Sequence, residues 1–496
     1  MDNKTEISYV LIRWLFIRFL SLIYFFAFLS YLLEAKGLYG TEGILPVAKN
    51  ISPDFFELPT LFLFWHSDSA LISTGAFGLF FSILAFSGIL TGPLLFLLWF
   101  LYLSIVNAGN VFMSFQWDIL LLEAGFLAIF LSSWKPLDLH FQYFFSDKFF
   151  VDLGKPPVAV IWLFRFLLFR LMFASGLVKI KSGDETWHNL SALSYHYETQ
   201  PLPTPGGWIM HQFPDWFQSF STLSMFFIEL IVPFLFFAPR KLRYIAGFLE
   251  IALQILIILT GNYCFFNLLT IALCLFLFDD NFIEKFTRGK FKPLLEKINN
   301  VFKPSRVRFL YLGPLLCLII FLSLLQFPPD TNLPGPFYAL ARPFYPYHLV
   351  NSYGLFAVMT VDRPEIIVEG SEDGESWQAY QFKYKAGPLD RPPCVIQPLQ
   401  PRLDWQMWFA SLGEVYQNGW FVAFIEKLLE GSSDVLSLLD HNPFPDKPPR
   451  LIRARVYNYE MTDPGELLKT GNWWKRTFVK EYLPPVSLIK DRKQRQ

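Results

Sequence analysis

The chain has 496 residues, of which 53% are hydrophobic and only 17% are charged. Soluble globular chains usually carry about 25% charged residues, so the composition excludes an ordinary soluble protein over most of the length. The formal net charge is zero, which excludes the broad basic field typical of nucleic-acid-binding proteins. The long apolar runs all lie before residue 328. We therefore expect an α-helical polytopic membrane bundle in residues 1–327 and a soluble, β-rich domain in residues 328–496.

Nine segments meet or approach the roughly 20 apolar residues that a membrane-spanning helix needs. The first is longer than the apolar core of a signal peptide, about 7–15 residues, and no small-residue cleavage site ends it. We therefore expect it to stay in the protein as a membrane helix. The predicted spans are residues 10–33, 70–90, 93–107, 119–133, 158–180, 217–238, 243–260, 262–278 and 309–327.

The basic residues predict how these helices are oriented. Residues 279–308 carry eight Lys or Arg residues against four Asp or Glu, and a short loop this basic is expected in the cytoplasm. Counting helices from there predicts a cytoplasmic N-terminus and a cytoplasmic 134–157 loop. The C-terminal domain and the loops 34–69 and 181–216 then share the opposite face. That face is lumenal for a protein of the endoplasmic reticulum membrane in a eukaryote, or periplasmic for an inner-membrane protein in a bacterium.

Charged side chains inside the predicted spans are candidates for function, because each is costly in lipid. One hypothesis is that the carboxylates pair with arginines and link helices; the other is that they line a polar cavity open to the outer face. Lys179 lies at the outer end of its segment. It either extends its ammonium group to the interface or, in a partly apolar site, loses its proton and acts as a base. The six residues are Glu123, Arg165, Arg170, Lys179, Glu229 and Glu250.

The 181–216 loop contains three histidines and several carboxylates. Their spacing fits no compact metal-binding motif, so we expect no metal site. Trp187, His188, His196 and Glu198, followed by three prolines, instead favour a rigid loop over the mouth of the bundle. No hydrolase or nucleotide-binding fingerprint is convincing in the chain, and we expect no cofactor.

The C-terminal domain shows strand and helix patterns in turn. Residues 365–370 read as a strand, residues 371–374 as a turn, and residues 377–384 as the returning strand. Short amphipathic helices are predicted at 403–412 and 420–430. Residues 450–460 alternate as another strand.

Six motifs in the chain carry a family resemblance. They are SGLVK (175–179), TQPLP (199–203), TGNY (260–263), NSYGLFAVMT (351–360), RPEIIVEGS (363–371) and QPRLDWQMWFA (400–410). These motifs resemble those of the lipase maturation factor family. In animals this family comprises endoplasmic reticulum membrane proteins needed for folding and assembly of secreted homodimeric lipases, with a lumenal C-terminal domain implicated in client binding; bacterial members also exist. The resemblance therefore implies a non-enzymatic folding factor whose partners are a secreted lipase and the lipid bilayer.

Aromatic and charged residues at the centre of the C-terminal motifs give a candidate client-binding surface. Exposed residues of these types favour partner interfaces. The oligomeric state is left open. The candidates are Tyr353, Arg363, Glu365, Arg402, Asp404, Trp405 and Trp408.

A fainter similarity suggests an alternative function. Residues 175–179, followed by Asp184 and Trp187, look like a helix of vitamin-K-dependent γ-glutamyl carboxylases and of horizontally transferred transmembrane-domain proteins. This implies a membrane-embedded enzyme that acts on a lipid or peptide with Lys179 as its base. A lipid-handling or transport protein is a third hypothesis, although no pair of interrupted helices of the transporter kind is evident.

Overall fold

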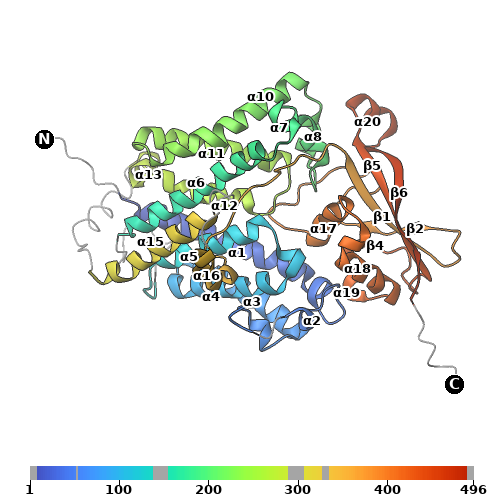
Figure 1. Ribbon diagram of the computed structural model, residues 1–496, viewed down its shortest axis with the longest axis horizontal. Coiled ribbons are helices and arrows are strands. Elements are labelled where there is room, and N and C mark those ends of the chain that lie inside the picture. Colours follow the sequence, from blue (N-terminus) through green and yellow to red (C-terminus); the bar gives the residue numbers. More distant parts are fainter. Residues whose placement is uncertain (1–7, 52–53, 138–154, 289–305, 327–334, 489–496) are drawn as a thin grey trace.

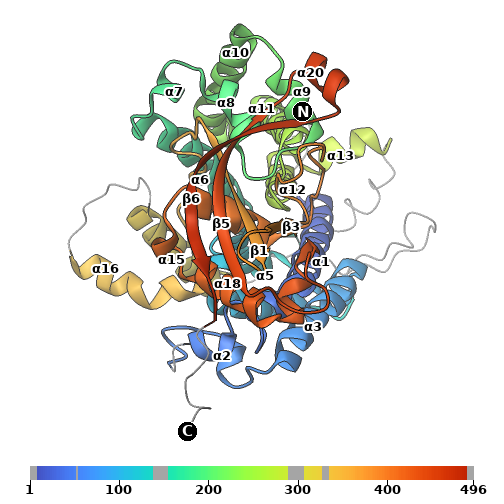
Figure 2. The same ribbon diagram turned by 90° about the vertical axis from the view of Figure 1, so that its right-hand side faces the viewer.

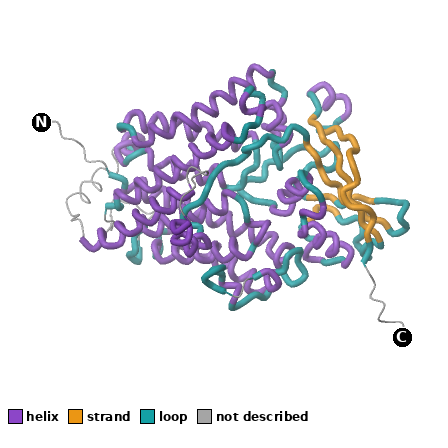
Figure 3. The backbone as a smooth tube through the Cα atoms, in the orientation of Figure 1, coloured by secondary structure: helices purple, strands orange, loops and turns teal. Residues whose placement is uncertain are grey.

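The computed structural model describes residues 8–51, 54–137, 155–288, 306–326 and 335–488. Helices fill one end of an elongated molecule, and a smaller part that contains the β-sheets lies at the other end (Figure 1). Turned by 90°, the strands β1, β5 and β6 lie in front of the helices (Figure 2). Figure 3 shows the same division, with strands gathered at the end from which the C-terminus leaves.

Six helices in the described ranges are long and apolar enough to cross a membrane, so this is an integral membrane protein. A seventh span results if α12 with η6 (Phe266–Leu277) and α13 (Asp280–Phe286), which meet at 100°, are counted together. The six are α1 (Val10–Tyr39), α3 (Asp68–Ser87), α4 (Thr91–Ala108), α6 (Val158–Lys181), the continuous segment Asp215–Phe237, and α11 (Arg240–Thr260).

The predicted count of nine spans is not confirmed. The 119–133 segment forms α5 (Gln116–Leu131), which has only 16 residues and is mostly buried among other helices. The 262–278 segment belongs to the bent pair. In α15 (Arg306–Gln326) the apolar stretch found within the described residues is Leu312–Gln326. The predicted loops 134–157 and 279–308 lie mostly outside the described residues.

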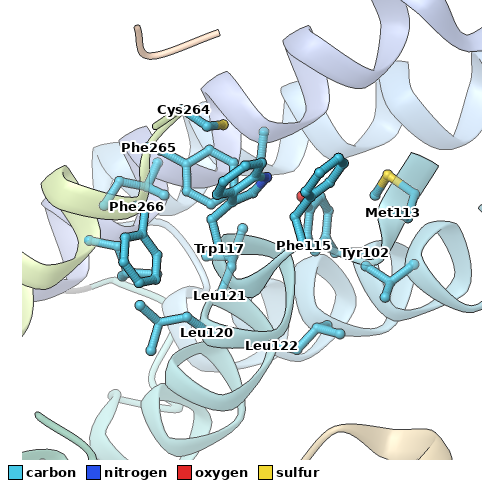
Figure 4. Packing of buried hydrophobic residues seen from close by; sticks show 14 of the residues in the cluster. Tyr102, Met113, Phe115, Trp117, Leu120, Leu121, Leu122, Cys264, Phe265 and Phe266 are labelled. Carbon is cyan, nitrogen blue, oxygen red and sulfur yellow. The ribbon is translucent and has the colours of Figure 1, made fainter. Parts of the chain in front are cut away.

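Small residues allow the first helices to pack closely. A Cβ atom added to Gly78 of α3 would lie 2.3 Å from the ring of Phe28 in α1, and one on Gly75 would lie 2.5 Å from Leu32. Such small residues let membrane helices approach each other. Behind them, Phe115 stacks on Trp117 with 4.6 Å between ring centroids. These rings gather with the 264–266 segment in one buried cluster (Figure 4).

The main sheet has four antiparallel strands in the order β2-β1-β5-β6. The predicted strands 365–370 and 450–460 are confirmed as β1 (Arg363–Ser371) and β5 (Leu451–Met461), which pair directly. The predicted returning strand is instead divided between β2 (Gln378–Ala379) and β3 (Gln381–Phe382). β3 pairs with β4 (Leu439–His441) in a separate two-stranded sheet. β6 (Trp474–Val486) was not predicted, because most of its residues are exposed.

Helices lie beside this sheet, and the two predicted ones are confirmed as α17 (Arg402–Ser411) and α18 (Gly419–Glu430). In Figure 1, α17 lies between the sheet and the bundle. The 34–69 and 181–216 segments lie at the same end of the bundle as this C-terminal part, since both form hydrogen bonds with it. The remaining short elements are α2 (Val47–Asn50), η1 (Leu61–Leu63), η2 (Asn110–Met113), α7 (Glu185–His188), α8 (Ala192–Thr199), α9 (Pro205–His211), α10 (Asp215–Phe226), η4 (Phe227–Ile231), η5 (Val232–Phe237), α16 (Gly335–Ala341), η7 (Arg342–Tyr347), η8 (Val415–Gln417), α19 (Ser433–Leu436) and α20 (Pro464–Thr470).

Candidate functional site: the docking interface and the bundle cavity

A buried ion pair joins the C-terminal part to the bundle. Arg402, the first residue of α17, donates two hydrogen bonds of 2.9 Å to the carboxylate of Asp118 in α5. It also donates to the carbonyl of Phe112 at 2.6 Å, while the Tyr102 hydroxyl donates to Asp118 at 2.5 Å. The exposed fractions of the two charged side chains are 1% and 0%. Multiple hydrogen bonds of this kind are what a desolvated ion pair requires.

Glu123 forms a second link. It pairs with Arg170 of α6, as the helix-linking hypothesis predicts. The same carboxylate accepts hydrogen bonds from the backbone N–H of Asn351 at 3.0 Å and from the hydroxyl of Tyr353 at 2.8 Å. The NSYG motif of the C-terminal part is therefore bound to an intramembrane ion pair of the bundle.

A third link uses the end of the 181–216 segment. The guanidinium of Arg363 donates to the carbonyls of Glu198 at 2.7 Å and Pro201 at 3.0 Å, and it pairs with Glu365 at 2.7 Å. The indole N–H of Trp408 donates to the carbonyl of Thr199 at 2.8 Å. The TQPLP motif of the bundle is thus recognised through its backbone by residues of the RPEIIVEGS and QPRLDWQMWFA motifs.

The client-binding hypothesis requires exposed side chains, and this prediction is wrong for the candidate residues of the C-terminal motifs. Their exposed fractions lie between 1% and 6%. The physical reason is that their polar atoms are used internally, as when Asp404 accepts from the backbone N–H groups of Tyr384 and Lys385. Trp405 packs edge-on against Trp117 of α5, with 4.9 Å between centroids. The buried set is Tyr353, Arg363, Glu365, Arg402, Asp404, Trp405 and Trp408.

A cavity of about 890 Å³ lies in the bundle beneath the 181–216 segment. Its walls come from helices of the bundle and of the 181–216 segment, with Tyr263, the 355–356 segment and Val395, and most of its lining side chains are apolar. The helical elements are α6, α7, α8, α9, α10, η4, α11 and α12. Lys179 and Glu229 line it and form an ion pair, with Nζ–Oε distances of 2.7 and 3.0 Å. Lys179 also donates to the carbonyl of Ser175 at 3.1 Å. The lysine is buried and does not extend to the interface.

The backbone places Glu229 in this cavity by an irregular turn. The chain leaves α10 through a π-helix, η4, at Phe227–Ile231 and continues through Val232–Phe237 as a 3-10 helix. A Cβ atom on Gly176 of α6 would lie 2.8 Å from the side chain of Leu230 and 3.0 Å from the Cβ of Glu229, so a larger residue at this position would force these side chains to shift. π-helical turns of this kind are rare and are frequent at functional sites.

His196 of α8 lines the cavity on the side of the 181–216 segment and has a defined hydrogen-bonding pattern. The Tyr263 hydroxyl donates to the side-chain carbonyl of Gln200 at 2.9 Å, so the contact of 3.0 Å between this hydroxyl and His196 Nε2 requires Nε2 to donate. Nδ1 is then left as an acceptor. Burial and the positive charge of Lys179 lower the pKa of His196 to about 4, so the ring is neutral at physiological pH.

The other candidate residues of the 181–216 segment each have polar contacts of their own, and Trp187 also lines the cavity, with its ring centroid 5.5 Å from Lys179 Nζ. The indole of Trp187 donates to the carbonyl of Phe356 at 3.0 Å, His188 contacts the carbonyl of Ile180 at 3.1 Å, and Glu198 pairs with His211 at 3.0 Å. Within the described ranges no three His, Cys, Asp or Glu residues come together as a metal site. The loop is shaped by contacts with the bundle and with the C-terminal part.

The two remaining intramembrane candidates, Arg165 and Glu250, do not form the predicted carboxylate–arginine pair. Arg165 donates to the carbonyl of Phe276 at 2.9 Å and to the hydroxyl of Tyr9 at 2.7 Å. Glu250 is fully buried, and its carboxylate oxygens have no hydrogen-bond partner among the described residues. Within the described part of the chain, Glu123 pairs with an arginine, Glu229 pairs with Lys179, and Glu250 has no such partner.

Sequence reasoning missed two polar residues that hold the parts together. Asp118 stands one position before the predicted 119–133 span, so it was not counted as intramembrane. Asn262 accepts from the backbone N–H of Ile396 at 2.8 Å and donates to the carbonyl of Cys394 at 2.7 Å. The sequence feature that could have identified Asn262 is its position in the TGNY motif.

Comparison with known proteins decides the family. Residues 11–285 match the family model described as the lipase maturation factor transmembrane domain, and residues 349–484 match that of the lipase maturation factor C-terminal domain. The chain belongs to the lipase maturation factor family. Relatives include lipase maturation factor 2 of Xenopus tropicalis, which is 36% identical over 95% of this chain and 81% of the relative. Lipase maturation factor 1 of Homo sapiens is 35% identical over 97% of this chain and 88% of the relative. No solved structure matches the chain.

These findings confirm the resemblance and give no support to the carboxylase-like alternative. In this member of the lipase maturation factor family, Lys179 donates to a carboxylate from which it is separated by 2.7 Å. The geometry is that of a buried ion pair and not of a free base.

Proposed function

We propose that this protein is a non-enzymatic membrane factor that assists the folding and assembly of secreted lipases. The observation that carries the proposal is that both of its parts match lipase maturation factor domains, and that relatives bearing this name align over nearly its whole length. Its partners are then a lipase client and the lipid bilayer.

The arrangement of the loops supports a meeting place for the client. The C-terminal part and the 34–69 and 181–216 segments lie at one end of the bundle. The basic 279–308 loop predicts that this end is outside the cytoplasm. In a eukaryotic host it faces the lumen of the endoplasmic reticulum, where secreted lipases fold; in a bacterial host it faces the periplasm.

We assign different roles to the buried and to the exposed residues of the 400–416 segment. Its buried residues, Arg402 above all, fix the C-terminal part on the bundle. On the open side, Phe409 of α17, Leu412 directly after this helix and Tyr416 in the following 3-10 helix η8 are exposed. Apolar and aromatic side chains of this kind are common at protein interfaces, so we propose that the client contacts this face.

The test compares two exposed positions in cells that lack their own lipase maturation factor. Tyr416→Ser is expected to reduce capture of a co-expressed secreted lipase and the yield of active enzyme, with unchanged abundance of the factor. Leu468→Ser, on α20 and also exposed, is the matched control. Equal lipase yield with both variants would exclude the proposed face. Equal yield with and without the whole protein would exclude the function itself.

A further inference from the structure

We propose that the bundle cavity binds an uncharged amphiphile with a hydrocarbon chain and a hydroxyl-bearing head, of the monoacylglycerol class. The inference goes beyond the action on lipases and does not depend on it. It follows from the size of the cavity, the side on which it opens and the polar groups that line it.

The cavity has the size and lining of a ligand site. Its volume of about 890 Å³ lies within the range of about 300–1,000 Å³ typical of small-molecule pockets. Such pockets are mainly apolar and contain a few polar groups that fix orientation. Here the apolar walls include Leu171, Met172 and Phe266, and the polar groups are few.

The cavity opens toward the hydrocarbon of the bilayer. Its wall includes Phe220 of α10 with Leu256 and Leu259 of α11, whose exposed fractions are 62%, 57% and 58%. Both helices belong to predicted membrane spans. They run along the outer edge of the bundle in Figure 1. Since large apolar side chains on such an edge face lipid, an acyl chain can enter sideways from the membrane.

Two residues that line the cavity each have a buried side-chain acceptor without a donor among the described residues. Asn267 is 2% exposed, and its side-chain oxygen has no partner among the described residues. Nδ1 of His196 is a second acceptor that has no partner among the described residues. Both residues line the cavity. Because a buried acceptor without a donor is unfavourable, a hydroxyl group is the fitting partner.

The charges of the lining exclude an anionic head group. Among the residues described around the cavity, Lys179 is the single lysine or arginine. It is already neutralised by Glu229, whose carboxylate oxygens lie 2.7 and 3.0 Å from Nζ. A phosphate or carboxylate would therefore find no free cation. This argument favours a glycerol-type head over that of a phospholipid or a fatty acid.

The test uses the full chain in phosphatidylcholine nanodiscs and a monoacylglycerol that carries a diazirine in its acyl chain. Irradiation is expected to label peptides from residues 215–231 and 253–270. The labelling should saturate, and excess unlabelled monoacylglycerol should reduce it at least fivefold. Labelling of the unmodified protein that does not saturate and spreads over all lipid-facing helices would overturn the proposal.

Two variants and a second probe sharpen the result. Ser221→Phe places a ring in the cavity wall and should lower labelling at least fivefold, whereas Ser219→Phe, two residues away and outside the lining, should leave it unchanged. Equal labelling of these two variants would contradict the site. A diazirine fatty acid of the same chain length should label at least fivefold less; equal labelling would overturn the uncharged head group.

Discussion

Replacing Arg402 by methionine would leave Asp118 as an unpaired charge at the docking interface. The pair is almost inaccessible to solvent and has two hydrogen bonds of 2.9 Å. Removal of one member of a buried pair typically costs about 3–5 kcal/mol. Because 1.4 kcal/mol is tenfold in an equilibrium constant, the undocked fraction should rise about 140- to 3,700-fold. Arg402→Met with Asp118→Leu should recover part of this loss, and only part, because Tyr102 then loses its acceptor.

The reactivity of Cys264 measures this undocking. Its thiol is 1% exposed and lies 3.5 Å from the carbonyl of Pro398 in the C-terminal part. In a protein with Cys317 and Cys394 replaced by serine, only buried Cys274 competes for a water-soluble maleimide. The labelling rate should follow the undocked fraction and rise by the same factor.

A surface pair provides the control for this experiment. Lys480 and Glu414 are 2.6 Å apart and nearly half exposed, and such pairs contribute about 0–1 kcal/mol. Lys480→Met should therefore change the labelling rate by less than tenfold. If Arg402→Met reacts no faster than Lys480→Met, the ion pair does not hold the two parts together.

Three further outcomes are expected from thermal and chemical unfolding in detergent. Lys179→Met strands a buried carboxylate, so it should lower stability by about 3–5 kcal/mol, and adding Glu229→Leu should restore part of it; a double variant no better than the single one would contradict the ion-pair role. Because the pKa of His196 falls from 6.5 to about 4 on folding, the unfolded state binds the proton first. The contribution of neutral His196 to the free energy of unfolding is therefore complete above pH 6.5 and is lost as the pH falls toward 4, with a loss of about 2 kcal/mol at pH 5. In unfolding curves measured at pH 7 and pH 5, His196→Gln should remove this difference in stability. Gly78→Val forces a side chain against a ring 2.3 Å away and should cost about 1–3 kcal/mol, whereas Gly313→Val, with no atom within 4 Å, should have no such effect; equal melting temperatures would refute the packing argument.

Periodicity predicts the elements of the C-terminal part that bury one face. β5 alternates between buried and partly exposed residues, and α18 buries one apolar side, so both have a sequence signature. β6 lacks that signature because most of its 13 residues are exposed. It is held by backbone pairing to β5, which leaves no pattern in its own side chains.

The number of spans could not be derived from hydropathy alone. An apolar segment is required both for a helix in lipid and for a helix enclosed by protein. α5 is the second kind, since Leu120, Leu121 and Leu122 are all buried. Hydropathy also does not report a sharp bend such as the one between α12 and α13.

The residues of the candidate site were predictable, but their partners were not. The cost of charge in lipid identifies Lys179 and Glu229 from sequence. Their pairing depends on the π-turn at Phe227–Ile231, which no rule of 3.6-residue periodicity anticipates. Likewise, Trp405 and Arg402 have the chemistry of interface residues, and the interface they form lies within the chain.

The separation of Asp118 and Arg402 along the chain has a consequence for biogenesis. The two residues are 284 positions apart, and at about 5–20 residues per second the arginine is made about 14–57 s after the aspartate. Arg170, the partner of Glu123, is only 47 positions further along the chain and is made much sooner. During synthesis, Asp118 of the nascent bundle therefore lacks its cationic partner until α17 emerges. A chain that ends early keeps that acid, so truncated products differ chemically from finished ones at a site inside the bundle.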